Sequence, residues 1–197
     1  MSVTVIVSRL AGMGRWAPGA SGRLQEAAFS LYAAQGFEET TVAQIAEAAG
    51  VTERTFFRYF ADKREVLFAG SDALLAVIVA EVGDGSPMDQ VVAALSAAAG
   101  LLTHRAHSRQ RQAVINANPV LQERELIKLA SWSTALRGLL VERGVPVLDA
   151  SLAAETGVAV FRVAFEQWLA ATDRRTLVDH VAEALGALAA GVGSVTP

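Results

Sequence analysis

Apolar residues recur at helical spacing along most of this chain, and this periodicity limits its fold more than any other feature. In the first such segment, four apolar residues are spaced i, i+3, i+4 and i+7: Leu24, Ala27, Ala28 and Leu31. That spacing places them on one face of an amphipathic helix. No segment alternates apolar and polar residues over the length of a half-buried strand. The fold is therefore predicted to be all-α, with about nine helices.

Capping residues and helix breakers set the expected limits of these helices. Thr41 followed by Gln44 has the spacing of a capping box, Thr52 can cap a second short helix, and Asp62 can cap a longer one that reaches toward Ala80. The expected helices span 23–35, 42–49, 53–60, 62–80, 87–103, 105–117, 119–143, 149–171 and 174–190. We predict a flexible arm over 1–20, a small unit over 21–66 and a larger helical unit over 67–197.

Composition excludes several classes of protein. Hydrophobic residues make up 52% of the 197 residues and charged residues only 19%. The charged residues are therefore too few to shield all of the apolar surface from water. The longest internal stretch without charge, Gln90 to Thr103, is shorter than the roughly 20 residues of a spanning helix. The first residues also lack the basic region of a signal peptide. We expect a cytoplasmic protein whose surplus apolar surface is covered by a partner subunit or an apolar ligand.

The chain contains no cysteine, which excludes disulfides, thiol catalysis and thiolate metal sites. Helical bundles can also house di-iron enzymes, but those sites need Glu-x-x-His pairs, which the sequence lacks. His104, His107 and His180 are interpreted as surface or capping residues. We therefore predict no enzyme activity, no cofactor and no metal.

Two short helices joined by a glycine turn give residues 42–60 the spacing of a helix-turn-helix. Ala46 is small where the helices would cross, and Gly50, four residues later, can supply the left-handed backbone of the turn. The second helix, Glu53 to Phe60, would then enter the major groove of DNA. Many helical hairpins share this spacing, so a ligand-sequestering helical protein without DNA function remains an alternative.

Charge favours DNA binding locally and not across the whole chain. The net charge is −3, yet the segment from Thr52 to Arg64 contains four basic residues and two acidic ones. The aromatic residues Phe57 and Tyr59 lie among them. Specific binding needs a few well-placed phosphate and base contacts more than a broad basic surface. We expect weak binding to unspecific DNA and tight binding, as a dimer, to the correct sequence.

Residues 23–68, and above all TTVAQIAEAAGVTERTFFRYFADKREVLF, resemble the DNA-binding domain of the TetR family of bacterial repressors. The resemblance implies phosphate contacts from Thr41, Tyr59 and Lys63. It also implies that the second helix presents residues to bases or adjacent phosphates, and that Phe57 replaces a usual tyrosine, a loss for which Arg54 can compensate. The predicted DNA-binding set is Thr41, Thr52, Arg54, Thr55, Phe57, Arg58, Tyr59 and Lys63. Phe56 and Phe60 are expected in the core.

The remainder of the chain resembles the acyl-CoA-responsive branch of the same family, through Asn118-Pro119-x-Leu121, the Trp132 helix and the Phe161 to Leu169 run. Singly, its aromatic and aliphatic residues are expected in an ordinary core. Together, five of them are predicted to line an apolar pocket for a hydrophobic or acyl-chain effector. These pocket residues are Leu102, Trp132, Leu136, Phe161 and Phe165.

Alanine-rich stripes on the last two helices predict a homodimer held by a four-helix interface. The predicted interface residues are Val160, Val163, Leu177, Val181, Leu185 and Leu188. Twofold symmetry matches a palindromic operator in double-stranded DNA. We therefore predict a repressor whose effector moves the helix after Lys63, changes the spacing of the paired recognition helices and lowers operator affinity.

Overall fold

The computed structural model describes residues 19–193, which form nine helices and no strand. The helices are α2 (Ala20–Gln35), α3 (Val42–Ala48), α4 (Glu53–Tyr59), α5 (Ser71–Ala80), α6 (Pro87–Leu101), α7 (Arg105–Asn116), α8 (Pro119–Glu142), α9 (Val147–Ala170) and α10 (Leu177–Gly193). The all-α prediction is confirmed. Of the arm predicted over 1–20, all but Gly19 and Ala20 lie outside the described residues, and those two begin α2.

Capping residues set the starts of three helices, two of them predicted from the sequence, Thr41 and Thr52. Thr41 forms a complete capping box with Gln44 at the start of α3, and Ser86 forms one with Asp89 at the start of α6. Thr52 caps α4 through the backbone N–H of Thr55. Each cap satisfies an N–H group that the first helical turn leaves without a partner.

The link between α4 and α5 differs from the single helix predicted over 62–80. Asp62 does cap a turn, but i to i+3 hydrogen bonds follow it, and Gly70, with φ of +88°, breaks the path before α5 begins at Ser71. Three consecutive apolar side chains of this link are all buried: Val66, Leu67 and Phe68.

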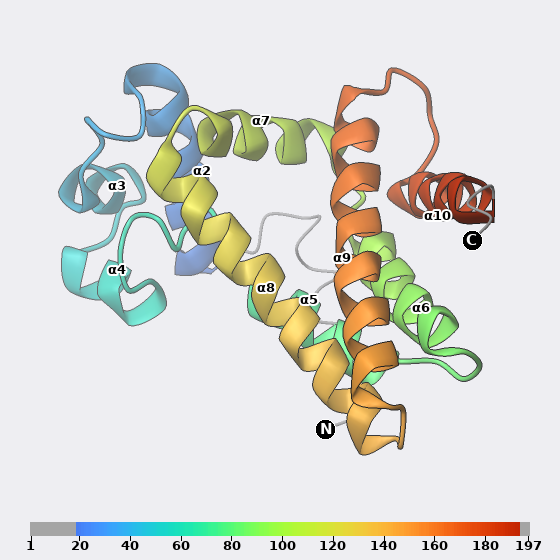
Figure 1. Ribbon diagram of the computed structural model, residues 1–197. Coiled ribbons are helices and arrows are strands. Elements are labelled where there is room, and N and C mark those ends of the chain that lie inside the picture. Colours follow the sequence, from blue (N-terminus) through green and yellow to red (C-terminus); the bar gives the residue numbers. More distant parts are fainter. Residues whose placement is uncertain (1–18, 194–197) are drawn as a thin grey trace.

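The helices are arranged in two groups (Figure 1). At one end, α3 and α4 pack with α2. At the other, α8 and α9 converge toward the turn that joins them, α9 crosses α6, and α10 packs against α9 and α6. The α7 helix joins the groups, because it contacts α2 as well as α8 and α9.

Two hydrophobic clusters correspond to these groups. The first, which we call the N-terminal core, contains apolar residues between Leu24 and Phe68 together with Ile115 and Leu121. The second, the regulatory core, is built from α5, α6, α8, α9 and α10 and is rich in alanine. In the regulatory core α9 approaches α6 so closely that a Cβ on Gly157 would lie 2.2 Å from Val91 Cγ1. Within residues 19–193, no helix is long and apolar enough to cross a membrane.

Candidate nucleic-acid interface

The turn between α3 and α4 has the geometry that its sequence predicts. Gly50 adopts φ of +66°, a left-handed conformation that glycine reaches without strain. The N–H of Val51 then donates to Ala46 O at 2.9 Å, which closes the turn. Ala46 itself is buried at the crossing of the two helices. The two short helices are therefore held at a fixed angle by backbone hydrogen bonds and close packing.

Helix α4 has one buried face and one exposed face. Phe56 is fully buried and Phe60 nearly so, as expected of core residues under this helix. On the other side, Phe57 is 54% exposed and Tyr59 44% exposed, and the Arg54 and Arg58 side chains are exposed as well. A shallow surface hollow is lined by Arg54, Thr55, Phe57 and Arg58. The structure therefore brings these predicted DNA-binding residues together on one surface.

Hydroxyl groups and guanidinium groups on this surface already contact one another. Thr52 Oγ1 lies 3.1 Å from Thr55 Oγ1 and accepts from the Thr55 N–H at 3.2 Å. Arg58 Nη2 donates to the Tyr59 hydroxyl at 3.2 Å, and its guanidinium lies 5.0 Å from the centre of the Tyr59 ring. Arg58 and Tyr59 thus present one cation and one hydroxyl side by side, a pair suited to phosphate oxygens.

Thr41 lies at the start of α3 and is exposed. Its hydroxyl accepts from the Gln44 N–H at 3.2 Å, while its own N–H donates to Gln44 Oε1 at 2.8 Å. Gln35 Nε2 donates to that same Oε1 at 3.1 Å, so α2 takes part in fixing this helix start. The N-terminal turn of a helix carries partial positive charge, which favours a phosphate nearby.

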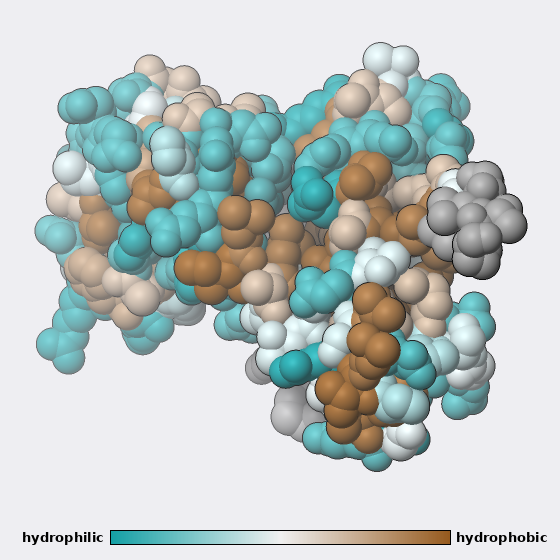
Figure 2. Space-filling model, in the orientation of Figure 1, coloured by the Kyte–Doolittle hydropathy of each residue, from teal (hydrophilic) through white to brown (hydrophobic). Residues whose placement is uncertain are grey.

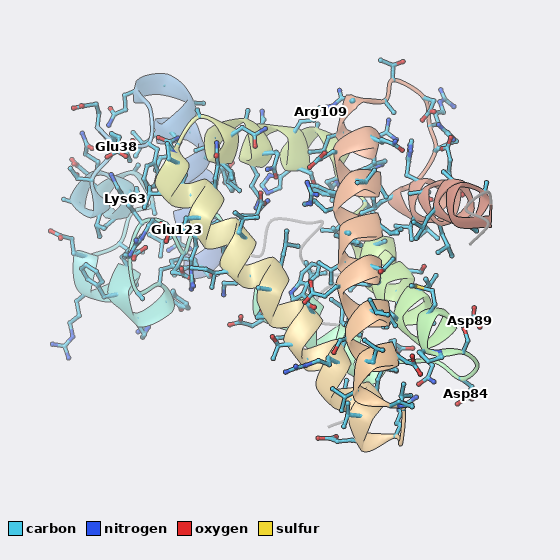
Figure 3. All side chains as sticks on the ribbon, in the orientation of Figure 1. Glu38, Lys63, Asp84, Asp89, Arg109 and Glu123 are labelled. Carbon is cyan, nitrogen blue, oxygen red and sulfur yellow. The ribbon has the colours of Figure 1, made fainter. Side chains whose placement is uncertain are left out.

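Lys63 is placed differently from the other predicted contacts. Its ammonium donates to three backbone carbonyls before α3, at 2.8 Å to Phe37 O and at 3.0 Å to both Glu38 O and Thr40 O. Figure 3 shows Lys63 in this region of α3 and α4. A lysine ammonium has three N–H donors, so these bonds use all of them. Lys63 therefore braces the loop between α2 and α3 in this state, and its phosphate contact stays a prediction.

Other bracing residues could not be found from the sequence. The Tyr32 hydroxyl donates to Lys63 O at 2.7 Å, and Arg23 Nε donates to Ala49 O at 3.1 Å, at the end of α3. Burial, with a smaller contribution from the Asp62 carboxylate, raises the pKa of Tyr32 well above its usual value, so the hydroxyl keeps its proton. These partners are far apart in the chain, and no local pattern marks them.

A salt bridge follows the recognition helix. Arg64 donates through its side chain and its backbone to Asp62, with 2.5 Å between Arg64 Nη2 and Asp62 Oδ2. Burial pushes the pKa of Asp62 upward, but hydrogen bonds from Arg64 and from the Glu65 N–H outweigh it and leave the pKa below its usual value. Asp62 is therefore ionised at neutral pH and neutralises one of the basic residues counted in the sequence.

The five predicted pocket residues all belong to the regulatory core. Trp132, Leu136 and Phe161 are buried, and Leu102 and Phe165 are partly buried against them. Aromatic rings form a continuous series, with centroid distances of 5.4 Å from Trp132 to Phe161, 6.4 Å from Phe161 to Phe165 and 5.8 Å from Phe165 to Trp168. Two surface hollows, one over α4 and one between α2 and α7, are lined by other residues. The pocket therefore stays a prediction.

The six predicted interface residues are divided by their burial. Leu177 and Val181 are each 1% exposed within the single chain, and Val160 is also buried. Other helices of the same chain therefore already cover these three residues. Val163 is 40% exposed, and Leu185 and Leu188 are partly exposed. A helical stripe shows which residues need cover, but it does not distinguish a neighbouring helix from a second subunit.

His180 contradicts its interpretation as a surface or capping residue. It is 2% exposed, and neither ring nitrogen has a hydrogen-bond partner among the described residues. The Glu183 carboxylate lies 3.9 Å from its Nδ1, beyond hydrogen-bond distance. His180 lies between two buried apolar residues of α10, Leu177 and Val181, and this spacing is the sequence signal for a core position. Over residues 19–193, no group of three or more His, Asp or Glu side chains could hold a metal ion.

A short capped helix that meets its partner at a glycine turn, and that exposes two arginines, a tyrosine and a threonine, defines a helix-turn-helix DNA-binding protein. Comparison with known proteins agrees. The chain belongs to the TetR family: the model "Bacterial regulatory proteins, tetR family" matches residues 24–69, and the model of the MftR C-terminal domain matches residues 85–193. It is a TetR-type transcriptional regulator.

Individual relatives support the same assignment. The chain is 30% identical over 181 residues to the MftR protein of Mycobacterium tuberculosis, whose name assigns it to regulation of mycofactocin biosynthesis, with 87% of this chain and 88% of that protein covered. It is 43% identical over 77 residues to the transcriptional regulator TcmR of Streptomyces glaucescens, but that match spans 37% of this chain and about a third (34%) of TcmR. Both relatives are transcriptional regulators.

A solved structure shows the same fold. The FadR repressor of Thermus thermophilus, crystallised with lauroyl-CoA, has a TM-score of 0.53 and is 24% identical, with 90% of this chain and 96% of that chain covered.

Proposed function

We propose that this protein is a cytoplasmic repressor that binds a palindromic operator as a homodimer and leaves it when a hydrophobic, acyl-type effector binds. The observation that carries the proposal is the division of α4 into a fully buried face under Phe56 and an exposed face with Arg54, Arg58 and Tyr59. A helix built in this way costs no refolding when it enters a major groove. No catalytic activity is part of the proposal.

The proposed DNA contacts follow from the position of each side chain. Arg54, Thr55 and Phe57 line the hollow on α4 and are proposed to face base edges, where guanidinium groups and the methyl groups of thymine are natural partners. Arg58, Tyr59 and the start of α3 at Thr41 are proposed to hold phosphates. Thr52 acts mainly as the cap that orients the first turn of α4.

The homodimer is supported by apolar side chains that the single chain leaves exposed on α9. These include Val147, Leu148 and Leu152 near its start and Val163 further along. Figure 2 shows an apolar strip over the lower half of α9. Exposed apolar patches of this kind mark interaction sites. A second copy packed here would present two recognition helices with the twofold symmetry of a palindrome.

The effector proposal rests on the aromatic series of the regulatory core. An acyl chain would replace contacts among Trp132, Phe161 and Phe165, so the pocket would open as the ligand enters. His180 lies between two residues of the same cluster, and its unpartnered nitrogens offer a polar contact for the ligand. The lauroyl-CoA bound by the Thermus repressor is the model ligand for this class.

DNA selection tests the operator proposal. The purified protein is incubated with a pool of random duplexes, and the bound fraction is amplified and sequenced. We expect enrichment of a palindromic sequence with two half-sites, and a mass in the complex that corresponds to two chains on one duplex. Failure to enrich any sequence above the starting pool would contradict the proposal and favour a ligand-sequestering protein.

Lauroyl-CoA tests the effector proposal. Because Trp132 and Trp168 lie in the aromatic series, binding of the acyl chain should change the tryptophan fluorescence and release the selected DNA. Coenzyme A without an acyl chain is the control and should do neither. Equal release by coenzyme A alone would show that the apolar cluster does not recognise the effector.

A further inference from the structure

The N-terminal core is completed by residues from far along the chain. Ile115, near the end of α7, and Leu121, in the first turn of α8, are both fully buried in this core. Asn118 fixes the bend between them, because its Nδ2 donates to Val114 O at 2.6 Å. We call residues 111–125 the α7–α8 corner. This corner belongs by sequence to the regulatory domain and by packing to the DNA-binding domain.

Arg111, in this corner, connects the two domains through one guanidinium. Its Nε donates to Leu67 O at 2.7 Å, in the link after the recognition helix, and its Nη1 donates to Glu125 Oε1 at 3.1 Å, in α8. The same guanidinium lies 5.1 Å from the centre of the Phe68 ring. The planar fork of arginine allows these contacts at once, and lysine cannot reproduce them.

A second bridge lies beside the first. Glu65 accepts from Arg124 Nε at 2.6 Å, and Lys128 Nζ lies 3.8 Å from the other Glu65 oxygen and 3.3 Å from Asp72 Oδ1. All of these acidic groups lie on the link or the start of α5, and both cations lie on α8. The link is therefore bound to the regulatory domain by two sets of contacts.

The chain itself offers a much weaker connection. A continuous helix from α4 into the regulatory domain would transmit motion as a rigid rod, but residues 62–70 form turns and Gly70 is left-handed. A turn that ends in glycine bends at little cost. The orientation of α4 relative to the regulatory domain must therefore be set by contacts outside the chain path, which are the packing of Ile115 and Leu121 and the polar contacts to the link. Arg111 joins the link to both α7 and α8.

We propose that Arg111 is a positioning residue, through which the α7–α8 corner sets the orientation of the recognition helix. Regulatory motion then reaches α4 through the corner and not along the chain after Lys63. The link to DNA release rests on the proposed function, but the positioning role itself can be measured without DNA or effector.

A distance measurement within one chain tests this role. The protein has no cysteine, so Glu53→Cys on α4 and Arg137→Cys on α8 give two defined sites for spin labels, both exposed. Labelled chains are mixed with an excess of unlabelled ones, so that distances between subunits do not contribute. The distribution of label distances is measured by pulsed electron paramagnetic resonance in the otherwise native protein and in the same chain with Arg111→Ala or Arg111→Lys.

We expect the native arginine to give one narrow distribution, and both substitutions to broaden it and shift its mean. The matched control is Arg109→Ala on the same helix. Arg109 donates to Leu169 O and Ala171 O at the end of α9 (Figure 3), so its loss should leave the distribution unchanged. If Arg111→Ala does not fold, Arg111→Lys decides the question.

An unchanged distribution in Arg111→Lys would overturn the proposal, even if the variant melted at a lower temperature, because stability alone would then be affected. An equal broadening in Arg109→Ala would also overturn it. Absence of DNA binding in the native protein would contradict the proposed function and leave the distance result standing.

Discussion

The two cores of this protein differ in the kinds of side chain that fill them. The N-terminal core is rich in large aromatic side chains, and its buried polar groups are partnered: the Tyr32 hydroxyl donates to Lys63 O and the Thr40 hydroxyl donates to Gly36 O. The regulatory core contains many alanines, a very close helix crossing at Gly157, and the unpartnered His180.

This difference matches what each region has to do. A recognition surface must present its side chains in one geometry, and interlocking rings with satisfied hydrogen bonds favour a single arrangement. A regulatory domain must exchange internal contacts for those of a ligand. Small side chains, a series of rings in contact and a buried polar group without a partner leave the regulatory core less tightly specified. Four substitutions test the comparison, and they follow in order of expected effect.

Removal of an aromatic ring from the N-terminal core should have the largest effect. Phe56→Ala leaves a cavity at a fully buried position and should lower the free energy of unfolding by about 3–5 kcal/mol. Denaturant unfolding followed by circular dichroism measures this loss. We expect α2–α4 to unfold first while the regulatory core stays folded. A single transition with unchanged midpoint would show that the N-terminal core does not depend on this ring.

The close crossing in the regulatory core should tolerate no added methyl group. Gly157→Ala forces Val91 to move and should cost about 1–3 kcal/mol. Gly138→Ala on α8 is the matched control, because a Cβ there meets nothing within 4 Å, and it should stabilise the helix by roughly 0.5–1 kcal/mol. Thermal melting of both variants compares them. Equal melting temperatures would mean that the regulatory core adapts freely at this crossing.

Loss of a capping hydroxyl should have a smaller effect and should be confined to the N-terminal domain. Thr41→Ala removes one half of the capping box and should lower stability by about 1 kcal/mol. Thr41→Ser keeps the hydroxyl and is expected to retain most of the stability that the cap contributes. Hydrogen exchange at the first turn of α3 measures the change locally. Exchange as slow as in the native protein would show that α2 and Lys63 alone hold this helix start.

The fourth substitution should increase stability, by an amount similar to the loss in Thr41→Ala. His180→Leu replaces a buried polar side chain that lacks partners with an apolar one of similar size, and should raise stability by roughly 1 kcal/mol. Leu177→Ala, one turn away and buried, should instead be destabilising. Both can be compared by denaturant midpoint. A loss of stability in His180→Leu would indicate that the imidazole has a hydrogen-bond partner in solution. The buried polar groups of the regulatory core would then be as fully hydrogen-bonded as those of the N-terminal core.

Local signals in the sequence predicted most of the fold. Thr41 with Gln44 and Thr52 each start a helix where expected, because a cap and its helix are only a few residues apart. The turn at Gly50 and the core positions of Phe56 and Phe60 follow from spacing in the same way. The surface of α4 was predictable for this reason, since its exposed residues are those that the helical period leaves outside the core.

Long-range partners could not be predicted. The single helix expected over 62–80 was wrong because glycine at position 70 fits a helix or a left-handed break equally well in sequence, and only the packing of the link decides between them. Lys63 is typical of a phosphate contact, yet three distant carbonyls use its protons here. Nor does any pattern connect Arg111 to Leu67. Such contacts depend on how the helices are assembled in space.

The salt dependence of DNA affinity in Arg58→Ala tests the central claim, that the exposed face of α4 carries DNA binding. Affinity for the selected duplex is measured over a series of salt concentrations for the native protein, for Arg58→Ala and for Arg137→Ala, which removes an equal charge from an exposed position on α8. We predict that Arg58→Ala loses about 1–3 kcal/mol of binding free energy and that the slope of log affinity against log salt flattens by about one, while Arg137→Ala matches the native protein. Affinity and slope in Arg58→Ala equal to those of the native protein would contradict the account.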